Sequence, residues 1–203
     1  MEPWAIFKSD LFNKFMRNIF ILAAAGLFFS CSQKKESNPV VQIISPYGDI
    51  KIELYPLKAP KTVAAFISYI DSGYYKGSSF YRVIKAEDMP TDYNDGLIQG
   101  GIWPQMKNLK GIDHEPTSQT GLSHTNGIVS LARTAPGTAT TEFFICIGDQ
   151  TQLDAGRKGT GDGLGYAAFG KVIKGMDVVR KIQSESSTGE NFRNKIPINN
   201  ITR

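Results

Sequence analysis

Apolar and polar residues alternate along several short stretches of the chain, a pattern that is typical of strands. Residues 50–54 (Ile-Lys-Ile-Glu-Leu) place apolar and charged side chains on opposite faces, as in a strand with one face in water. Residues 46–49 (Pro-Tyr-Gly-Asp) predict a tight turn just before it. Together with this strand, the pattern predicts strands at 40–44, 79–85, 96–99, 127–133, 142–147, 166–172 and 196–202.

Two segments show helical spacing instead. Pro60 suits the first turn of a helix and Gly73 its end, and the residues between them form one apolar face: Val63, Phe66, Ile67 and Ile70. A second helix is predicted after Gly175, with Val178, Val179 and Ile182 facing inward. Many short strands with only two helices favour a mostly antiparallel barrel or sandwich.

Composition places the chain among ordinary globular proteins. Its 203 residues are 41% hydrophobic and 21% charged, which fits one domain with a sizeable core and excludes a disordered or collagen-like chain. The net charge of +4 comes from 23 basic and 19 acidic residues without blocks, so no basic face for nucleic acid is indicated. Two cysteines exclude a disulfide-stapled scaffold and a four-cysteine zinc site.

The N-terminal segment has the features of a targeting signal. Residues 19–29 (IFILAAAGLFF) carry no charge and are too short to span a bilayer, but they suit the apolar region of a secretory signal. Lys14 and Arg17 precede this run, and Ser30 and Cys31 follow it. This order resembles a bacterial lipoprotein signal, in which the cysteine sulfur carries a diacylglyceryl group. We therefore expect a signal at 1–30, a polar tether at 31–39 and the folded domain at 40–203.

Two points about this segment stay open at the level of sequence. The alternative to a signal is a buried N-terminal helix with an incidental cysteine. Residues 1–15 are longer and more aromatic than the basic region of a signal, and translation from Met16 would give a compact one. If Cys31 is acylated, Cys146 has no partner for a disulfide within the chain.

Conventional catalytic groups are missing from the sequence. His114 and His124 lie in one long loop, and their spacing from Asp113 and Glu115 matches no metal-ligand motif, so we expect structural histidines and no metal or cofactor. Cys146 lies in an apolar strand, where thiols usually only pack. There is no Gly-x-Ser-x-Gly motif of a serine hydrolase. An enzyme with this sequence must work without a nucleophile or a metal.

A series of longer segments resembles the cyclophilins, in that family's order and across the whole chain after residue 40. The segments are 59–63 (APKTV), 75–84 (YKGSSFYRVI), 98–101 (IQGG), 127–133 (GIVSLAR), 136–145 (PGTATTEFFI), 165–172 (GYAAFGKV) and 174–179 (KGMDVV). Cyclophilins are peptidyl-prolyl cis-trans isomerases. The resemblance implies a mainly β fold, a closed eight-stranded antiparallel barrel capped by two helices.

The resemblance also implies a set of site residues. Arg82 takes the position of the catalytic arginine, and Gln99 that of the glutamine that hydrogen-bonds the substrate backbone. Phe144 would be the aromatic floor under the proline ring. The remaining substrate-binding residues would be Ala132 and Arg133, along the peptide main chain, and Leu97, Leu153 and Tyr166, in the pocket walls.

The chain departs from the family pattern near this site. Residues 85–96 are an insertion, and Gly96 falls where the family often supplies a pocket phenylalanine. One apolar wall is then thinner unless Tyr93 or Met89 replaces it. Glu142 stands where many members have glutamine, and Arg133 where asparagine is commoner.

These features predict a monomeric isomerase of proline-containing polypeptides. With a lipid anchor on Cys31 it would be an envelope protein, facing the periplasm or on the outer membrane, that assists the folding of exported chains. The alternative from another class is a membrane-tethered proline-peptide-binding module or chaperone with weak or no isomerase activity. A carbohydrate-active lipoprotein has no support, because no catalytic pair of carboxylates is identifiable.

Overall fold

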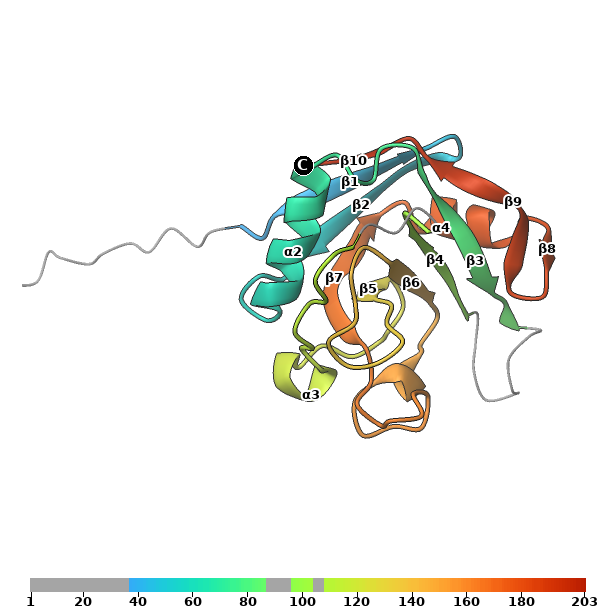
Figure 1. Cartoon of the computed structure of the whole chain (residues 1–203). Coiled ribbons are helices and arrows are strands. Elements are labelled where there is room, and N and C mark those ends of the chain that lie inside the picture. Colours follow the sequence, from blue (N-terminus) through green and yellow to red (C-terminus); the bar gives the residue numbers. More distant parts are fainter. Residues whose placement is uncertain (1–36, 87–95, 104–107) are drawn as a thin grey trace, which may run out of the picture. The chain divides into compact units, whose positions relative to one another are not determined.

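One antiparallel sheet with its covering helices makes up the structure. The computed structural model describes residues 37–86, 96–103 and 108–203. Its ten strands are β1 (Val40–Ser45), β2 (Gly48–Leu54), β3 (Ser78–Ile84), β4 (Gly96–Gly101), β5 (Ile128–Leu131), β6 (Phe143–Ile147), β7 (Ala167–Lys174), β8 (Ser187–Thr188), β9 (Asn191–Ile198) and β10 (Asn200–Thr202). They are hydrogen-bonded in the order β10-β1-β2-β7-β5-β6-β4-β3-β9-β8, and the sheet curls strongly around its core (Figure 1).

The first hairpin shows how the alternation in sequence becomes a two-faced strand. Val40 lies opposite Glu53 and Ser45 opposite Gly48, so β1 and β2 are joined by the short turn that the sequence predicts. In β2, Ile50, Ile52 and Leu54 are fully buried, while the charged residues between them reach the surface. The period of two therefore sets which face of this hairpin joins the core.

The closed eight-stranded barrel is the part of the expected fold that is wrong. The predicted last strand at 196–202 is two strands, β9 and β10, which are separated by Asn199. β9 pairs with β3 and β10 pairs with β1, and the Asn199 N–H donates to the Ile44 carbonyl over 2.8 Å. Residues 196–202 therefore pair with two strands, β3 and β1, that are not neighbours in the sheet. In the described part of the chain, no ladder joins the two ends of the strand order.

β8 and the first half of β9 are the elements that the sequence pattern missed. They form a hairpin whose turn contains Gly189, with a positive φ of 53°, and Glu190. Phe192 and Ile196 are buried, but the residues between them are polar and exposed. Because three polar residues in a row interrupt the alternation of apolar and polar side chains, the pattern typical of a strand can be recognised only from Ile196 onward.

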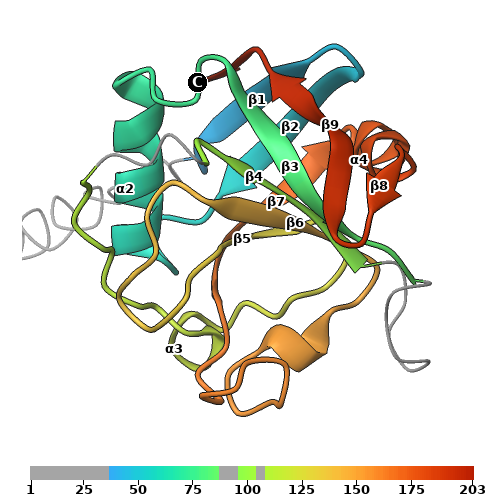
Figure 2. The same ribbon diagram turned by 45° about the vertical axis from the view of Figure 1, so that its right-hand side comes forward.

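Both predicted helices are present, and they are confirmed at their expected positions. α2 (Pro60–Asp71) begins with its proline in the first turn and is followed by Gly73, and α4 (Met176–Gln183) follows Gly175. Two short helices were not predicted, α3 (Thr117–Thr120) and the 3-10 turn η2 (Thr151–Leu153). α2 and α4 lie at opposite ends of the curled sheet (Figures 1 and 2).

Aromatic rings form the centre of the core beneath α2. Phe66 of α2 lies 4.9 Å from Phe169, 5.3 Å from Tyr75 and 5.7 Å from Phe143 between ring centroids. All four side chains are fully buried. Edge-to-face and tilted contacts of this kind stabilise beyond the area that they bury, so α2 is fixed against the sheet through Phe66.

The N-terminus of α2 is capped from a distant loop. Ala59 at the cap position makes no side-chain bond to the helix. Instead, Glu115, which is 1% exposed, accepts bonds from the Thr62 N–H at 2.8 Å, the Thr62 hydroxyl at 2.7 Å and the Lys61 N–H at 3.2 Å. A carboxylate there satisfies otherwise unpaired N–H groups and interacts favourably with the helix dipole. Glu115 therefore caps α2.

The predicted signal, Cys31 and most of the predicted tether lie outside the described residues. Within residues 37–86, 96–103 and 108–203, no helix has the length and apolar character needed to cross a membrane.

Replacing Glu115 tests the role of this cap. We expect Glu115→Ala to lower the free energy of unfolding by about 2–4 kcal/mol, because buried N–H groups at the start of α2 lose a charged acceptor. The neighbouring Asp113→Ala is the matched control, since Asp113 is exposed and pairs with Lys61 at the surface. Chemical denaturation of both variants measures the difference. Equal effects would show that Glu115 does not cap α2.

Candidate functional site

A pocket of about 460 Å³ lies where β3, β4 and β6 meet the ends of β5 and β7. It is polar along one side and apolar along the other. All eight residues that the resemblance assigns to the site line it: Arg82, Leu97, Gln99, Ala132, Arg133, Phe144, Leu153 and Tyr166. The structure thus brings together residues that are up to 84 positions apart in the chain, as the span from Arg82 to Tyr166 shows.

Arg82 and Gln99 form the centre of the polar side. They lie opposite each other on β3 and β4, where the register shifts by one residue after Phe80. Arg82 Nη1 donates to Gln99 Oε1 over 2.9 Å. The arginine side chain remains 37% exposed, so its guanidinium is held at the pocket wall and is still open to a ligand.

A second partner of Arg82 comes from the turn between β8 and β9. Glu190 Oε2 accepts from Arg82 Nε at 2.8 Å and also from Nη2. The two residues are 108 positions apart. A glutamate after a glycine in a polar stretch is typical of a surface turn, so no local signal points to this contact. The ion pair fixes the edge of the guanidinium that faces away from Gln99.

Tyr81 and Glu142 extend the polar side beyond Gln99. Gln99 Nε2 donates to the Tyr81 hydroxyl at 2.7 Å, and that hydroxyl donates to Glu142 Oε2 at 2.6 Å. Burial raises the pKa of Tyr81, and the bond to Glu142 raises this pKa further. Burial also raises the pKa of Glu142, although bonds from Tyr81 and Thr141 oppose that shift. The pocket therefore contains a continuous chain of side-chain hydrogen bonds.

The apolar side is a separate small cluster. Leu97, Phe144 and Cys146 are its buried members, and the following residues pack against them: Ile84, Ala132, Leu153 and Tyr166. The ring of Tyr166 stands edge-on to Phe144, with 5.2 Å between centroids. Burial raises the pKa of the Cys146 thiol well above its usual value, so this cysteine packs and does not react. A compact apolar ring such as that of proline fits against such a wall.

His124 supports this wall from behind. It is fully buried and stacks on Phe144 with 5.9 Å between centroids. Its Nδ1 lies 2.6 Å from Asp154 Oδ1 and its Nε2 lies 3.1 Å from the Ser130 hydroxyl. Burial acts to raise the pKa of Asp154, but bonds from His124 and Ser123 outweigh it and lower the value. The His124 ring is thus held by two side chains, those of Asp154 and Ser130.

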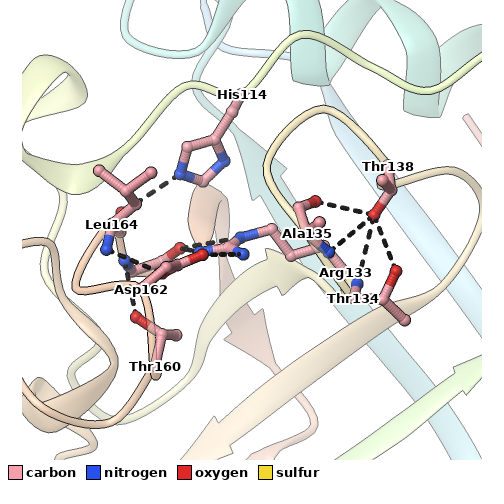
Figure 3. Close-up of polar contacts among 9 residues, drawn as sticks. His114, Arg133, Thr134, Ala135, Thr138, Thr160, Asp162 and Leu164 are labelled. Carbon is pink, nitrogen blue, oxygen red and sulfur yellow. Dashed lines mark hydrogen bonds and ion pairs between the residues drawn. The ribbon is translucent and has the colours of Figure 1, made fainter.

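Arg133 ties the glycine-rich loop at 154–165 to the end of β5. Its guanidinium makes two bonds to the Asp162 carboxylate, at 2.7 and 2.9 Å (Figure 3). It makes two more to the Gly165 carbonyl, at 3.1 and 2.6 Å. It also lies 5.4 Å from the centroid of the Tyr166 ring. Bonding to Arg133 holds the pKa of Asp162 well below its usual range. The side chain of Arg133 therefore positions the part of the wall that contains Tyr166.

The same loop is held from its other side by His114. Its Nε2 lies 3.2 Å from the Leu164 carbonyl (Figure 3). On the neighbouring turn, the Thr138 hydroxyl donates to the Ala135 carbonyl at 2.7 Å and accepts from the Ala135 N–H at 3.0 Å. The loop at 154–165 and the turn at 134–138, which both lie next to Arg133, are therefore held by local polar contacts.

The backbone at Gly96 explains why the apolar wall has no aromatic side chain at this position. Its φ is +93°, and a Cβ there would lie 2.1 Å from the Ile84 carbonyl oxygen. No larger side chain fits this backbone contact, and Ile84 itself lines the pocket. Met89 and Tyr93, which could replace the aromatic ring, lie outside the described residues.

The pocket also has lining residues that the resemblance did not assign to it. They are Tyr81, Ile84, Trp103, Thr134, Thr138, Thr140, Glu142 and Gly159. Tyr81 directly precedes Arg82, so its position in sequence could have indicated it. In the described ranges, no cluster of three or more His, Cys, Asp or Glu residues could hold a metal ion.

Comparisons with known proteins point to one family. The family model described as Cyclophilin type peptidyl-prolyl cis-trans isomerase/CLD matches residues 40–203. The chain is 37% identical over 166 residues to a peptidyl-prolyl cis-trans isomerase of Acinetobacter baylyi, covering 79% of this chain and 80% of that protein. It is 36% identical to peptidyl-prolyl cis-trans isomerase B of Escherichia coli, covering 74% of this chain and 88% of that protein. Among solved structures, a Cryptosporidium parvum cyclophilin type isomerase matches with a TM-score of 0.64 and 28% identity, covering 80% of this chain and 97% of that one.

Hydrogen exchange tests whether Arg133 holds the glycine-rich loop. We expect Arg133→Ala to speed exchange on the order of 10-fold at the Gly165 and Tyr166 amides, because a charged pair and two bonds to Gly165 are lost. Amides of β6 should be unaffected. Arg157→Ala is the matched control, since Arg157 lies in the same loop with an exposed side chain. Unchanged exchange at Gly165 in Arg133→Ala would contradict this role.

Proposed function

The chain belongs to the cyclophilin-type peptidyl-prolyl cis-trans isomerases and interconverts the cis and trans forms of X–Pro peptide bonds, and we propose that Arg82 stabilises the twisted amide during this rotation. The observation that carries the proposal is the position of the guanidinium. It is fixed by Gln99 and Glu190 at the rim of a pocket whose opposite wall is apolar.

The reaction itself explains why the site needs no nucleophile. Rotation about an X–Pro bond faces a barrier of ~18–20 kcal/mol from C–N resonance. The two end states differ by only about 0.5–1 kcal/mol. An enzyme therefore has to bind the twisted amide better than either planar form. In the twisted state the nitrogen becomes pyramidal and gains a lone pair, which a positioned donor can stabilise.

Arg82 has donors left for this purpose. A guanidinium carries five N–H groups, and the bonds to Gln99 and Glu190 in the described part of the chain use three of them. Two N–H groups on the terminal nitrogens therefore remain to address the prolyl nitrogen or a neighbouring carbonyl oxygen. Because the two partners already hold the guanidinium, little reorganisation is needed when the amide twists.

The other pocket residues suit the two parts of a proline-containing segment. We expect the proline ring to pack on Phe144, between Leu97 and Leu153, and Gln99 with the main chain at Ala132 and Arg133 to bind the peptide backbone, since all of these residues line the pocket. At Ala132 the group on offer is the carbonyl, because its N–H donates to the Glu142 carbonyl at 2.8 Å. The crystal structure of the Cryptosporidium parvum relative was determined in the presence of the dipeptide Ala-Pro, which supports a proline residue as the occupant of this pocket.

We further infer that the natural substrates are exported chains and that the enzyme is a lipoprotein of the cell envelope. This inference is supported by the apolar run at 19–29, by Ser30 and Cys31 after it, and by the polar residues 32–38. A lipid on Cys31 would tether the isomerase, as a monomer, to a membrane surface where unfolded exported chains emerge.

The role of Arg82 predicts a specific kinetic defect. We expect Arg82→Ala to lower kcat by ~10²-fold or more, which corresponds to about 3 kcal/mol of transition-state stabilisation. Peptide binding should weaken much less, because the apolar wall is unchanged. Two-site exchange NMR on an X–Pro peptide measures both kcat and peptide binding. Arg180→Ala on α4 is the matched control. Parallel losses in binding and turnover would mean that Arg82 only anchors the substrate.

The anchor predicts a change in mass and in membrane partition. Expressed in a bacterial host, the chain should be recovered in membranes with a lipid on Cys31. Cys31→Ser should lack that mass, whereas Cys146→Ala should keep it, because Cys146 is buried in β6. Mass spectrometry of the membrane fraction measures the outcome. An unmodified, soluble product from the unaltered chain would overturn this prediction.

A further inference from the structure

Four side chains in the pocket form one continuous hydrogen-bonded row. It runs from Glu142 to the Tyr81 hydroxyl, then to the side-chain amide of Gln99, and ends at the Arg82 guanidinium. The donor–acceptor distances are 2.6, 2.7 and 2.9 Å in that order. Glu142 is thus linked to Arg82 through two intermediate side chains.

The chemistry of the two ends fixes the direction of every bond in the row. An ionised carboxylate only accepts hydrogen bonds and a guanidinium only donates them. Tyr81 has one hydroxyl proton, and it gives this proton to Glu142. Its oxygen must then accept from Gln99 Nε2, which turns Gln99 Oε1 toward Arg82. With the amide flipped, two donors would face each other at Arg82.

The other oxygen of Glu142 keeps the carboxylate from rotating out of the row. Oε1 accepts from the Ile102 N–H at 2.9 Å and from the Thr141 hydroxyl at 3.1 Å. The residue is 8% exposed, and a Cβ on Gly101 would lie 2.4 Å from both carboxylate oxygens, so the space beside it is filled. The titratable groups that interact with it are Tyr81 of β3 and Tyr75 ahead of that strand, and Arg82 interacts in turn with Tyr81.

We propose that Glu142 is a positioning residue of the isomerase, which acts through Tyr81 to hold the Gln99 amide with its oxygen toward Arg82. The inference rests on the role proposed above for Arg82. It assigns a function to the two residues that extend the polar side beyond Gln99, Tyr81 and Glu142. Neither of them needs to touch the reacting amide.

Replacing the carboxylate by its isosteric amide should break this order. In Glu142→Gln the amide oxygen is needed by the Ile102 N–H, which leaves the NH2 group facing Tyr81. The Tyr81 proton then loses its acceptor, or it turns to Gln99 and flips that amide toward a donor–donor contact with Arg82. In the first arrangement the new NH2 group can donate to the Tyr81 oxygen, but the Tyr81 proton has no acceptor; in the second, the contact between Gln99 and Arg82 is lost. Either way the substitution removes the acceptor that sets the order of donors and acceptors in the row, although the size and shape of the side chain are kept.

Kinetics of single and double variants measure this coupling. We expect Glu142→Gln to lower kcat for an X–Pro peptide roughly 10-fold with little change in KM, because a misplaced catalytic group costs rate more than binding. In the Tyr81→Phe background, Glu142→Gln should change kcat less than about two-fold, since the link between the residues is gone. Glu53→Gln on β2 is the matched control for the substitution.

The pH profile distinguishes positioning from a structural role. Burial raises the pKa of Glu142 above its usual value, so its carboxylate takes up a proton as pH falls and can then donate to Tyr81. The unaltered enzyme should lose kcat on this acidic limb, whereas Glu142→Gln should lack that loss. Glu190 also faces Arg82, but it is present in both proteins, so the difference between the profiles reports Glu142.

The side-chain NMR signals of Gln99 test the row independently of turnover. The Gln99 NH2 resonances should shift in Glu142→Gln, and the same shift should appear in the unaltered protein at low pH. An unchanged kcat in Glu142→Gln, or losses in Glu142→Gln and Tyr81→Phe that simply add, would overturn the proposal. Failure of Arg82→Ala to slow the reaction would instead remove the role of Arg82, while the Gln99 shifts would still report its orientation.

Discussion

One extra residue in β3 determines which side chains reach the pocket. Phe80 lies opposite Gly100, but Arg82, not Tyr81, lies opposite Gln99, so β3 contains a bulge. In a regular ladder Arg82 would lie opposite Ile98, which is fully buried in the core. The bulge instead returns Val83 to the core opposite Ile98 and turns both Tyr81 and Arg82 toward Gln99. The polar side of the site depends on this irregularity.

Arg82 lies at the solvent-exposed end of the hydrogen-bonded row that runs from Glu142 through Tyr81 and Gln99. This position has an electrostatic consequence. A fully buried guanidinium would cost several kilocalories per mole in lost hydration, whereas a fully exposed one would lose its orientation. Arg82 is 37% exposed and is held by a carboxylate on one edge and an amide oxygen on the other. This arrangement keeps the charge partly hydrated and its geometry fixed before a substrate binds, which is what preorganised stabilisation of a transition state requires.

The sequence was sufficient for the residues that carry local patterns and insufficient for those that act at long range. The helices α2 and α4 and most strands follow from apolar spacing, and the resemblance selected Arg82 and seven other residues that the structure gathers on one pocket. The roles of these residues remain predictions. Glu190, in contrast, meets Arg82 from 108 positions away, and Glu115 meets Thr62 from 53.

The predicted number of strands was wrong for a related reason. β9 and β10 read as one strand because the alternation hides the break at Asn199, where one segment leaves β3 and joins β1. The β8–β9 hairpin has few apolar residues and is fixed by backbone pairing. Pairing of this kind depends on which strands meet in space, and a pattern along the chain does not contain that information.

The apolar wall shows how a glycine-rich loop can border a well-defined site. Leu153 and Tyr166 stand at the two ends of the loop at 154–165. At the first end, Asp154 is held by His124 and Ser123, and at the second, the Gly165 carbonyl is held by Arg133. The two ends are thus anchored on either side of β5, the first to the segment that precedes this strand and the second to Arg133, which follows it. Between the anchors the loop packs closely as well, because Arg133 also binds Asp162 and a Cβ at Gly159 would lie 2.3 Å from the Gln152 carbonyl oxygen. The shape of the wall at Leu153 and Tyr166 therefore depends on the two anchors and on the glycines that let the loop pack between them.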